Sequence, residues 1–307
     1  MSDMIDRIIH ADAVDGLKTI PDNTVNTCVT SPPYYRLRDY GVAGQIGLED
    51  TPEAYIDRLV TVFREVKRVL KSDGTLWVVI NDSYNGSGKG GGNKNTAVCT
   101  SPTSLVDLKP KDMIGIPWML AFALRDDGWY LRNDIIWYKG NPMPENVQDR
   151  CSRAYEHIFL FAKSKKYYFN ADTIADPIKQ SSVERMKRGR SDNNKYVNGI
   201  PGQPKQSING PRVKNSISDE LIPVTRNKRD VWEINTVPYK GAHFAAFPPK
   251  LVETCILAGC SAGGIVLDPF AGSGTTCMVA KQLDRRYIGI EINADYCRLA
   301  EKRVNKC

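Results

Sequence analysis

Residues 264–291 read GIVLDPFAGSGTTCMVAKQLDRRYIGIE, and this stretch decides the fold. An apolar run at 264–267 leads into a glycine-rich turn at 268–274, then a helical pattern at 275–282 and a second apolar run at 287–290. Two strands joined through a helix are typical of an open, mostly parallel sheet. In such sheets ligands bind at the carboxyl edge of the strands, which is where this turn lies.

The glycine-rich turn is suited to a nucleoside that carries an anionic group. Gly272 and Gly274 let the backbone come close to a ligand, and the start of the following helix favours negative charge. Glu291 ends the second strand, 17 residues after Gly274, where an acid typically accepts hydrogen bonds from ribose hydroxyls. NAD and S-adenosyl-methionine both fit this description. The dinucleotide spacing G-x-G-x-x-G is not met, because Cys277 stands at the third glycine position.

The alternation of strands and helices extends over most of the chain. Thr51 before Pro52 predicts the start of a long helix, and Asp73-Gly74 predicts the boundary before the next strand. Two later apolar runs are expected to form antiparallel edge strands of the same sheet. Strands are predicted at 7–10, 26–30, 75–80, 135–138 and 158–161, and further helices at 116–125, 249–258 and 294–304. The pattern predicts an α/β fold with a mixed, mostly parallel sheet and helices on both faces.

Two segments interrupt this alternation. Residues 85–107 are rich in Gly, Ser, Asn and Thr and predict a flexible loop. Residues 170–230 lack sustained periodicity and are interpreted as an insertion in a domain formed by 1–169 and 231–307. Within 181–230 there are eleven Lys or Arg against five Asp or Glu, which accounts for most of the net charge of +7. A concentrated basic segment suits a polyanion such as nucleic acid, with a solvated irregular loop as the alternative.

The composition excludes several classes of protein. The chain has 307 residues, of which 41% are hydrophobic and 25% charged, as in ordinary globular proteins. No apolar run approaches the ~20 residues of a membrane span, and the N-terminus lacks a signal-peptide pattern, so we expect a cytoplasmic protein. Eight cysteines without a CxxC pair and three scattered histidines argue against a metal site and against a disulfide framework.

A second motif, Thr30-Ser31-Pro32-Pro33-Tyr34, also follows a predicted strand. Its two prolines fix a rigid turn at the carboxyl edge of the sheet. The Ser31 hydroxyl and the Pro32 carbonyl can accept the two hydrogens of an amino group, and Tyr34 can stack on the base that bears it. The alternative is an edge turn with a tyrosine that serves packing. If the motif is catalytic, the sheet must bring it beside the late glycine-rich turn.

These two motifs resemble those of the amino-group DNA methyltransferases, in the permuted order that has the catalytic [DSN]PP[YF] loop first and the F-x-G-x-G cofactor loop last. The resemblance implies a Rossmann-like methyltransferase fold, S-adenosyl-methionine as cofactor and double-stranded DNA as substrate. It extends to the acidic segment 11–17, to 136–139 with 141–144, to 156–159 with 163–164, and to 241–248. The segments 136–144 and 156–164 resemble those that line the base pocket and the sheet edge.

The site residues follow from the motifs and from the resemblance together. The catalytic candidates are Ser31, Pro32, Pro33 and Tyr34. The cofactor-binding candidates are Asp12, Asp268, Phe270, Gly272, Ser273, Gly274, Thr275, Glu291, His243 and Phe244. The DNA-binding candidates, in the basic insertion, are Arg185, Lys187, Arg188 and Arg190. No metal is expected. A homodimer and a companion restriction endonuclease are left open by the resemblance.

The expected reaction is direct methyl transfer to the exocyclic nitrogen of a flipped-out base. A serine in the first position of the loop resembles cytosine-N4 enzymes, while acidic loops resemble adenine-N6 enzymes, so N4 is preferred and N6 is the alternative. Methylation of cytosine C5 is excluded. The enzymes that carry out this reaction use as nucleophile a cysteine that directly follows a proline, and no cysteine in this chain follows a proline. A dinucleotide-dependent oxidoreductase, a non-catalytic DNA-binding protein, and an RNA or protein-amide methyltransferase remain as other readings.

Overall fold

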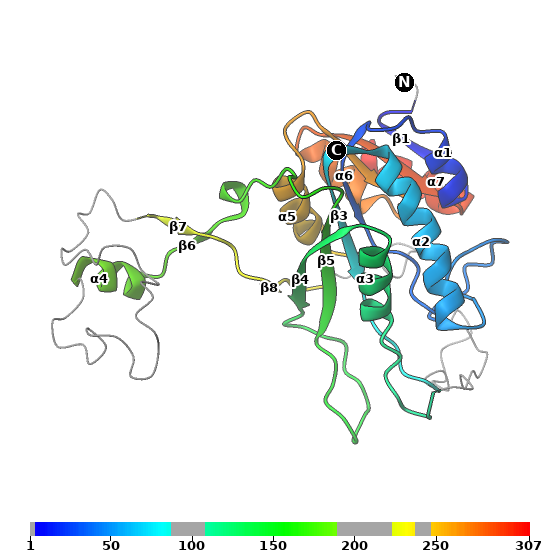
Figure 1. Cartoon of the computed structure of the whole chain (residues 1–307), viewed down its shortest axis with the longest axis horizontal. Coiled ribbons are helices and arrows are strands. Elements are labelled where there is room, and N and C mark those ends of the chain that lie inside the picture. The colour runs from blue at the N-terminus through cyan, green and yellow to red at the C-terminus, as the bar shows by residue number, and fades with distance from the viewer. Residues whose placement is uncertain (1–3, 87–107, 189–222, 237–246) are drawn as a thin grey trace. The chain divides into compact units, whose positions relative to one another are not determined.

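The computed structural model describes residues 4–86, 108–188, 223–236 and 247–307 (Figure 1). The chain divides into two compact units, one of residues 1–170 with 230–307 and one of residues 171–229. The second unit differs by one residue at each end from the insertion that the sequence predicts. Of the predicted loop at 85–107, residues 87–107 lie outside the described residues.

The larger unit is built on an eight-stranded sheet with the order β1-β10-β9-β2-β3-β5-β4-β8. Among these strands β5 alone runs antiparallel to its neighbours, and the other pairings are parallel. The strands are β1 (Arg7–His10), β2 (Val25–Thr30), β3 (Leu70–Ile80), β4 (Tyr130–Tyr138), β5 (Tyr155–Ala162), β8 (Val231–Glu233), β9 (Ile265–Asp268) and β10 (Arg286–Glu291). The predicted mixed, mostly parallel sheet is confirmed.

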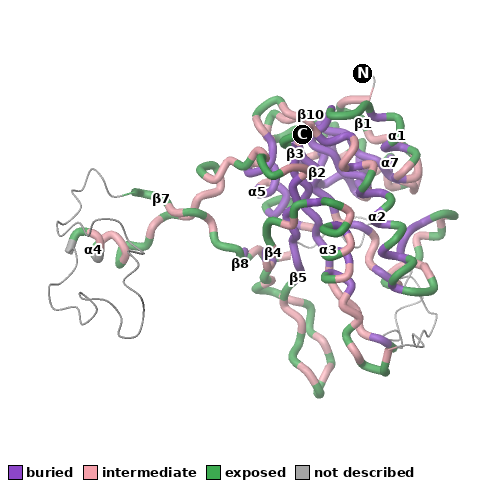
Figure 2. The backbone as a smooth tube through the Cα atoms, viewed as in Figure 1, coloured by how far each residue is buried: buried purple, intermediate pink, exposed green. Residues whose placement is uncertain are grey.

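Helices cover both faces of the sheet, as predicted (Figure 1). One face packs against α1 (Ala13–Lys18), α2 (Pro52–Val69) and α3 (Ile116–Asp126), whose apolar residues share a core with Leu76 and Val78 of β3. Successive strand residues point to opposite faces, so Trp77 lies on the other side, where Gly259 of α5 (Pro249–Gly259) approaches it. That side also carries α6 (Thr275–Gln282) and α7 (Ala294–Val304). Buried residues follow the strands and the inner sides of these helices (Figure 2).

The long helix α2 begins where the sequence predicts. The Thr51 side chain accepts a hydrogen bond from the Ala54 amide, and Pro52 occupies the first turn, where its missing N–H costs nothing. Tyr55, Leu59 and Phe63 are buried at three- and four-residue spacing. This apolar stripe fixes the helix against the sheet and brings Tyr55 under the proline-rich turn.

The predicted boundary at Asp73-Gly74 is wrong. Helix α2 ends at Val69, and β3 begins directly at Leu70, which pairs with Val25 before the register shifts ahead of Thr75. The carbonyls of Asp73 and Gly74 accept hydrogen bonds from Tyr168 and Lys163. Because chain from beyond β5 satisfies these carbonyls, a dipeptide that favours turns is held within an irregular strand.

The expectation that the two later strands form the sheet edge is also wrong. Strands β4 and β5 do pair antiparallel to each other, with Ile135 opposite Ile158. However, β8 adds to the outer side of β4 in parallel, with Ile136 opposite Val231. The β8 segment is only three residues long, too short for its alternation to be recognised in the sequence.

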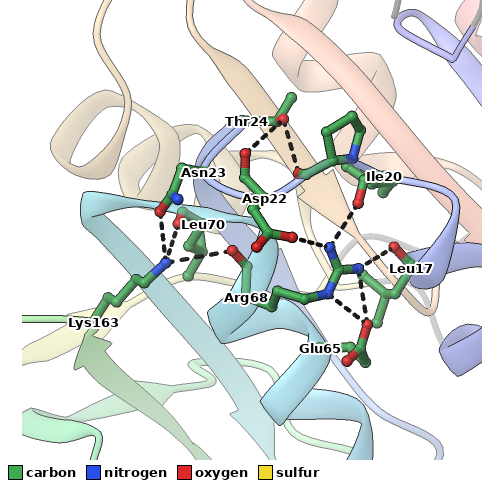
Figure 3. Close-up of polar contacts among 10 residues, drawn as sticks. Leu17, Ile20, Asp22, Asn23, Thr24, Glu65, Arg68, Leu70 and Lys163 are labelled. Carbon is green, nitrogen blue, oxygen red and sulfur yellow. Dashed lines mark hydrogen bonds and ion pairs between the residues drawn. The ribbon is translucent and has the colours of Figure 1, made fainter.

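A polar cluster holds the edge of the sheet opposite to the predicted site (Figure 3). The Arg68 guanidinium donates to the carbonyls of Leu17 and Ile20, at 2.9 Å each, and pairs with Asp22 at 2.6 Å. Lys163, just after β5, donates to the Leu70 carbonyl at 2.5 Å. These bonds satisfy carbonyls where α1 ends and β3 begins. The contacts at this edge stabilise the fold, and both predicted site motifs lie at the opposite edge, where the parallel strands end.

The smaller unit is described in part. It contains a 3-10 turn (η1, Asp172–Ile174), helix α4 (Gln180–Arg188) and two short strands, β6 (Asp176–Pro177) and β7 (Thr225–Arg226), that pair antiparallel. Lys228 pairs with Asp176 at 3.1 Å across this ribbon. None of the helices in the described parts of the chain is long and apolar enough to cross a membrane.

Candidate active site

The two motifs singled out in the sequence follow neighbouring parallel strands. Thr27 and Cys28 of β2 pair with Val266 and Leu267 of β9. The Thr30 hydroxyl donates to Asp268 Oδ1 at 2.7 Å, although the two residues are 238 positions apart. The turn at 31–34 and the turn at 270–274 therefore leave the same edge of the sheet side by side, which confirms the expected juxtaposition.

Asp268 connects the diproline turn to the glycine-rich turn through hydrogen bonds to Thr30 and Phe270. Its side chain is buried, and its Oδ1 also accepts from the Phe270 amide at 3.1 Å. Burial raises the pKa of this carboxyl to about 6. The sequence predicts Asp268 as a cofactor contact; its observed partners are protein groups, and a contact with the cofactor itself stays a prediction.

The pKa of Asp268 predicts a pH dependence of stability. The pKa is about 6 in the folded protein against an ordinary 3.8, so between these values the folded state binds the proton more tightly than the unfolded chain. The free energy of unfolding should therefore fall as the pH rises through this window, by up to about 3 kcal/mol. We expect Asp268→Asn to flatten this fall in urea unfolding between about pH 4 and pH 7.

The control for this measurement is Asp15→Asn, which removes a carboxylate whose side chain is 75% exposed. This variant keeps Asp268, so the fall expected for the wild-type protein should remain. Parallel curves for Asp268→Asn and the wild type would show that Asp268 does not titrate in this window.

Glu291 closes the glycine-rich turn. Its Oε2 accepts from the Gly272 amide and its Oε1 from the Asn293 amide, both at 2.8 Å. Burial raises the pKa of this carboxyl, and the backbone amides oppose that shift. Each carboxylate oxygen has a second lone pair, so Glu291 keeps acceptor capacity for the ribose hydroxyls that the sequence predicts. Gly272, with φ of 51°, has the left-handed backbone that such a turn requires.

The other cofactor candidates divide into two groups. Asp12 caps α1 by accepting from the Val14 amide at 2.8 Å, next to Ala11, whose amide donates to the Glu291 carbonyl. The side chains of Ser273 and Thr275 instead accept hydrogen bonds from Arg303 of α7 at 2.6 and 3.2 Å. Asp12 thus lies at the edge of the predicted site, whereas Ser273 and Thr275 anchor the turn to α7. His243 and Phe244 lie outside the described residues.

The proline-rich turn is held from two sides. The Tyr55 hydroxyl of α2 donates to the Pro33 carbonyl at 2.8 Å, which fixes the backbone of the turn. The Tyr34 hydroxyl donates to Glu156 Oε2 on β5, and the Ser31 hydroxyl lies 3.5 Å from the Tyr34 oxygen. Burial and the nearby Glu156 carboxylate raise the pKa of Tyr34 well above its usual value, so the phenol stays protonated and acts as a donor.

Sequence reasoning missed the partners that hold the turns. The segments at 136–139 and 156–159 resemble pocket walls, yet nothing in them indicates that Glu156 bonds Tyr34 and Lys139 at once. Tyr55 was visible only as an apolar position of a helix. Of the DNA candidates, Arg185, Lys187 and Arg188 belong to α4, and Arg190 lies outside the described residues. Their contact with DNA stays a prediction.

An open α/β sheet with a glycine-rich turn and a diproline turn on adjacent strands has the architecture of a Rossmann-like methyltransferase. The family model described as DNA methylase, of the N6 and N4 type, matches residues 25–302. The Type II methyltransferase M.SmaI of Serratia marcescens is 44% identical, over 97% of this chain and 90% of its own length. M.Cfr9I of Citrobacter freundii, also a Type II methyltransferase, is 42% identical over 97% and 87%. The chain therefore belongs to the N6/N4 DNA methylase family.

Solved structures share the fold at lower identity. The cytosine-N4-specific PvuII DNA methyltransferase superposes with a TM-score of 0.62 at 16% identity, covering 99% of this chain and 93% of that one. M1.HpyAVI, solved in complex with S-adenosyl-methionine, gives a TM-score of 0.54 at 20% identity, covering 97% and 98%. The predicted Rossmann-like methyltransferase fold is confirmed.

Proposed function

We propose that this protein transfers a methyl group from S-adenosyl-methionine to the N4 nitrogen of a cytosine flipped out of duplex DNA. The observation that carries the proposal is the joint between the two turns, in which Thr30 bonds Asp268 at 2.7 Å. A cofactor on the glycine-rich turn and a base on the diproline turn would share one edge of the sheet. Membership of the DNA methylase family supports DNA as the acceptor.

The residues of the glycine-rich turn fit S-adenosyl-methionine. Gly272 and Gly274 have φ of 51° and 76°, a left-handed backbone that glycine adopts readily, so the turn is tight where α6 begins. The Glu291 carboxylate lies beside Gly272 and is suited to the ribose hydroxyls, and Asp12 follows β1 next to it. When bound, the cofactor supplies an electrophilic methyl group on a cationic sulfur, so positioning provides much of the rate.

The diproline turn is suited to the acceptor base. The bond from Tyr55 to the Pro33 carbonyl and the restricted φ of Pro33 limit rotation of the preceding Pro32 carbonyl. The Ser31 hydroxyl and the Pro32 carbonyl accept the two amino hydrogens, which directs the nitrogen lone pair towards the methyl group. The Tyr34 ring stacks on the base and offsets part of the few kcal/mol that base flipping costs.

Cytosine N4 is preferred over adenine N6 because the first residue of the turn is neutral. Ser31 accepts a hydrogen bond without bringing a negative charge to the amino group, and the ring N3 of cytosine can share the proton handling. Acidic loops resemble the adenine enzymes. Adenine N6 is the second candidate, since the family model covers both bases.

The test is the identity of the modified base. Duplex DNA is incubated with the purified protein and S-adenosyl-methionine, digested to nucleosides and analysed by mass spectrometry. We expect N4-methylcytosine to be the product. Detection of N6-methyladenine alone would overturn the choice of base, and methylation of neither amino group would overturn the enzyme. Matched single-stranded DNA and RNA serve as competing acceptors, on which we expect less product.

We propose further that the basic segment at 181–230 contributes to recognition of the DNA sequence. Lys187 of α4 is exposed, and the surplus of positive charge around it suits phosphate contacts, so DNA binding should weaken as salt rises. The homodimer and the companion endonuclease remain predictions that rest on the family resemblance.

A further inference from the structure

The catalytic tyrosine candidate is connected to an ion pair on the neighbouring strands. Tyr34 donates its hydroxyl to Glu156 Oε2, and the Lys139 ammonium donates to Glu156 Oε1. Glu156 is 7% exposed and lies on β5, while Lys139 directly follows β4. The two oxygens of one buried carboxylate therefore serve two donors that come from different parts of the chain.

Strand geometry explains why these groups meet. Trp137 pairs with Glu156 across β4 and β5, so both point to the same face of the sheet. Lys139 lies two residues beyond Trp137, on the same side, and its ammonium lies 4.5 Å from the centre of the Trp137 ring. The Lys139 amide also donates to the Ala154 carbonyl at 2.7 Å. The base of the hairpin between β4 and β5 is thereby closed, and Lys139 has little freedom to leave Glu156.

The charges of Glu156 and Lys139 determine that the Tyr34 hydroxyl donates its hydrogen to the carboxylate. A buried carboxylate needs compensation, and Lys139 supplies it. The compensated carboxylate is a strong acceptor for the phenol, because hydrogen bonds to charged groups are roughly twice as strong as neutral ones. The phenol has one hydrogen to donate, and Glu156 receives it. The Tyr34 ring is thus held at its hydroxyl end by Glu156 and at its backbone end by the bond from Tyr55 to Pro33.

We propose that Glu156, compensated by Lys139, is a positioning residue that fixes the plane of the Tyr34 ring before the target base arrives. The base then stacks on a ring whose orientation is already set, so less order is lost in the transfer step. This inference rests on the proposed function. It adds a residue that acts through Tyr34 and does not itself touch the reacting atoms.

A double-mutant cycle with Glu156→Leu and Tyr34→Phe tests the proposal. Each single change removes the bond between phenol and carboxylate and leaves a ring at position 34. We expect each to lower kcat by about 10- to 100-fold, with the affinity for S-adenosyl-homocysteine changed by no more than about twofold. The double variant should be no slower than the slower single variant, because the two changes remove the same bond.

Control variants separate positioning from folding. Asp134→Ala removes the 2.9 Å contact with His157 on the same two strands but on the opposite face, and kcat should stay near that of the wild type. Glu156→Leu leaves Lys139 without its anion, so the double variant Glu156→Leu/Lys139→Met provides an apolar pair. It should restore the melting temperature to near that of the wild type and leave kcat low.

The outcomes are distinguishable from failure of the proposed function. If the wild-type protein methylates DNA and the two single effects multiply in the double variant, Glu156 acts on the base or elsewhere and the positioning role is wrong. The same holds if Glu156→Leu/Lys139→Met recovers both stability and kcat. If the wild-type protein methylates no DNA, the proposed function itself fails.

Discussion

Replacement of Tyr34 with Ala should reduce DNA methylation by about 10³-fold or more while the protein stays folded and binds its cofactor. Stacking of a base on an aromatic ring contributes about 1–3 kcal/mol, and loss of alignment at the reacting centre costs about another 100-fold. Tyr34 belongs to the diproline turn that follows β2, and the glycine-rich turn follows the neighbouring strand β9. Its loss should therefore fall on kcat and on flipping of the base, and leave cofactor affinity intact.

The measurement is single-turnover methyl transfer to a duplex, together with calorimetric titration of S-adenosyl-homocysteine. Tyr130→Ala is the matched control, since Tyr130 is a half-exposed aromatic residue at the start of β4, on the opposite edge of the sheet. That variant should retain wild-type activity. Near-normal methylation by Tyr34→Ala would remove this turn from the catalytic site.

Replacement of Gly274 with Ala should destabilise the protein by about 2–5 kcal/mol and weaken cofactor binding. A Cβ at this position would lie 2.7 Å from the Cβ of Ala300 and 3.0 Å from its Cα, and the residue has φ of 76°. The left-handed backbone alone costs an alanine about 1–2 kcal/mol, and the collision with α7 adds about 1–3 kcal/mol. Relief of the collision would move the start of α6 away from α7 and distort the glycine-rich turn that leads from β9 into α6.

The control variant Gly263→Ala separates the cost of the left-handed backbone from the cost of the collision with α7. Gly263 has a similar φ of 70°, but a Cβ there would meet nothing within 4 Å. Urea unfolding should show a loss of only about 1–2 kcal/mol for this variant, with cofactor affinity unchanged. Equal losses of stability and affinity in the two variants would mean that contact between the turn and α7 does not shape the cofactor site.

The elements that the sequence predicts well are those whose signals are local. Helix α2 starts at the Thr51 cap, and α6 and α7 have the predicted bounds, because caps and apolar periodicity are properties of adjacent residues. The two site motifs were recognisable because proline and glycine restrict or free the backbone in ways that a turn requires. Asp73-Gly74 misled for the same reason, since partners after β5 override its local preference.

The contacts that connect distant parts of the chain could not be predicted. The bond between Thr30 and Asp268 spans 238 residues, and no periodicity records which donor meets which acceptor over that distance. Glu156 lies just before the apolar run at 158–161 that predicts its strand, and nothing in that run indicates the bonds from Glu156 to Tyr34 and Lys139. Ser273 and Thr275 have the right chemistry for a cofactor, yet Arg303 of α7 binds their side chains.

The most direct test of the account is a crystal structure of the protein with S-adenosyl-homocysteine and a duplex that contains its target site. We expect a cytosine rotated out of the helix against Tyr34, with its N4 nitrogen held by Ser31 and the Pro32 carbonyl. The sulfur of S-adenosyl-homocysteine should lie beside the turn at 270–274 and point towards the cytosine N4. A methyl carbon placed on that sulfur would then lie about 3–3.5 Å from the N4 nitrogen. A target base bound away from the Ser31–Tyr34 turn, or a cofactor bound away from Glu291, would contradict a single active site formed by the two turns.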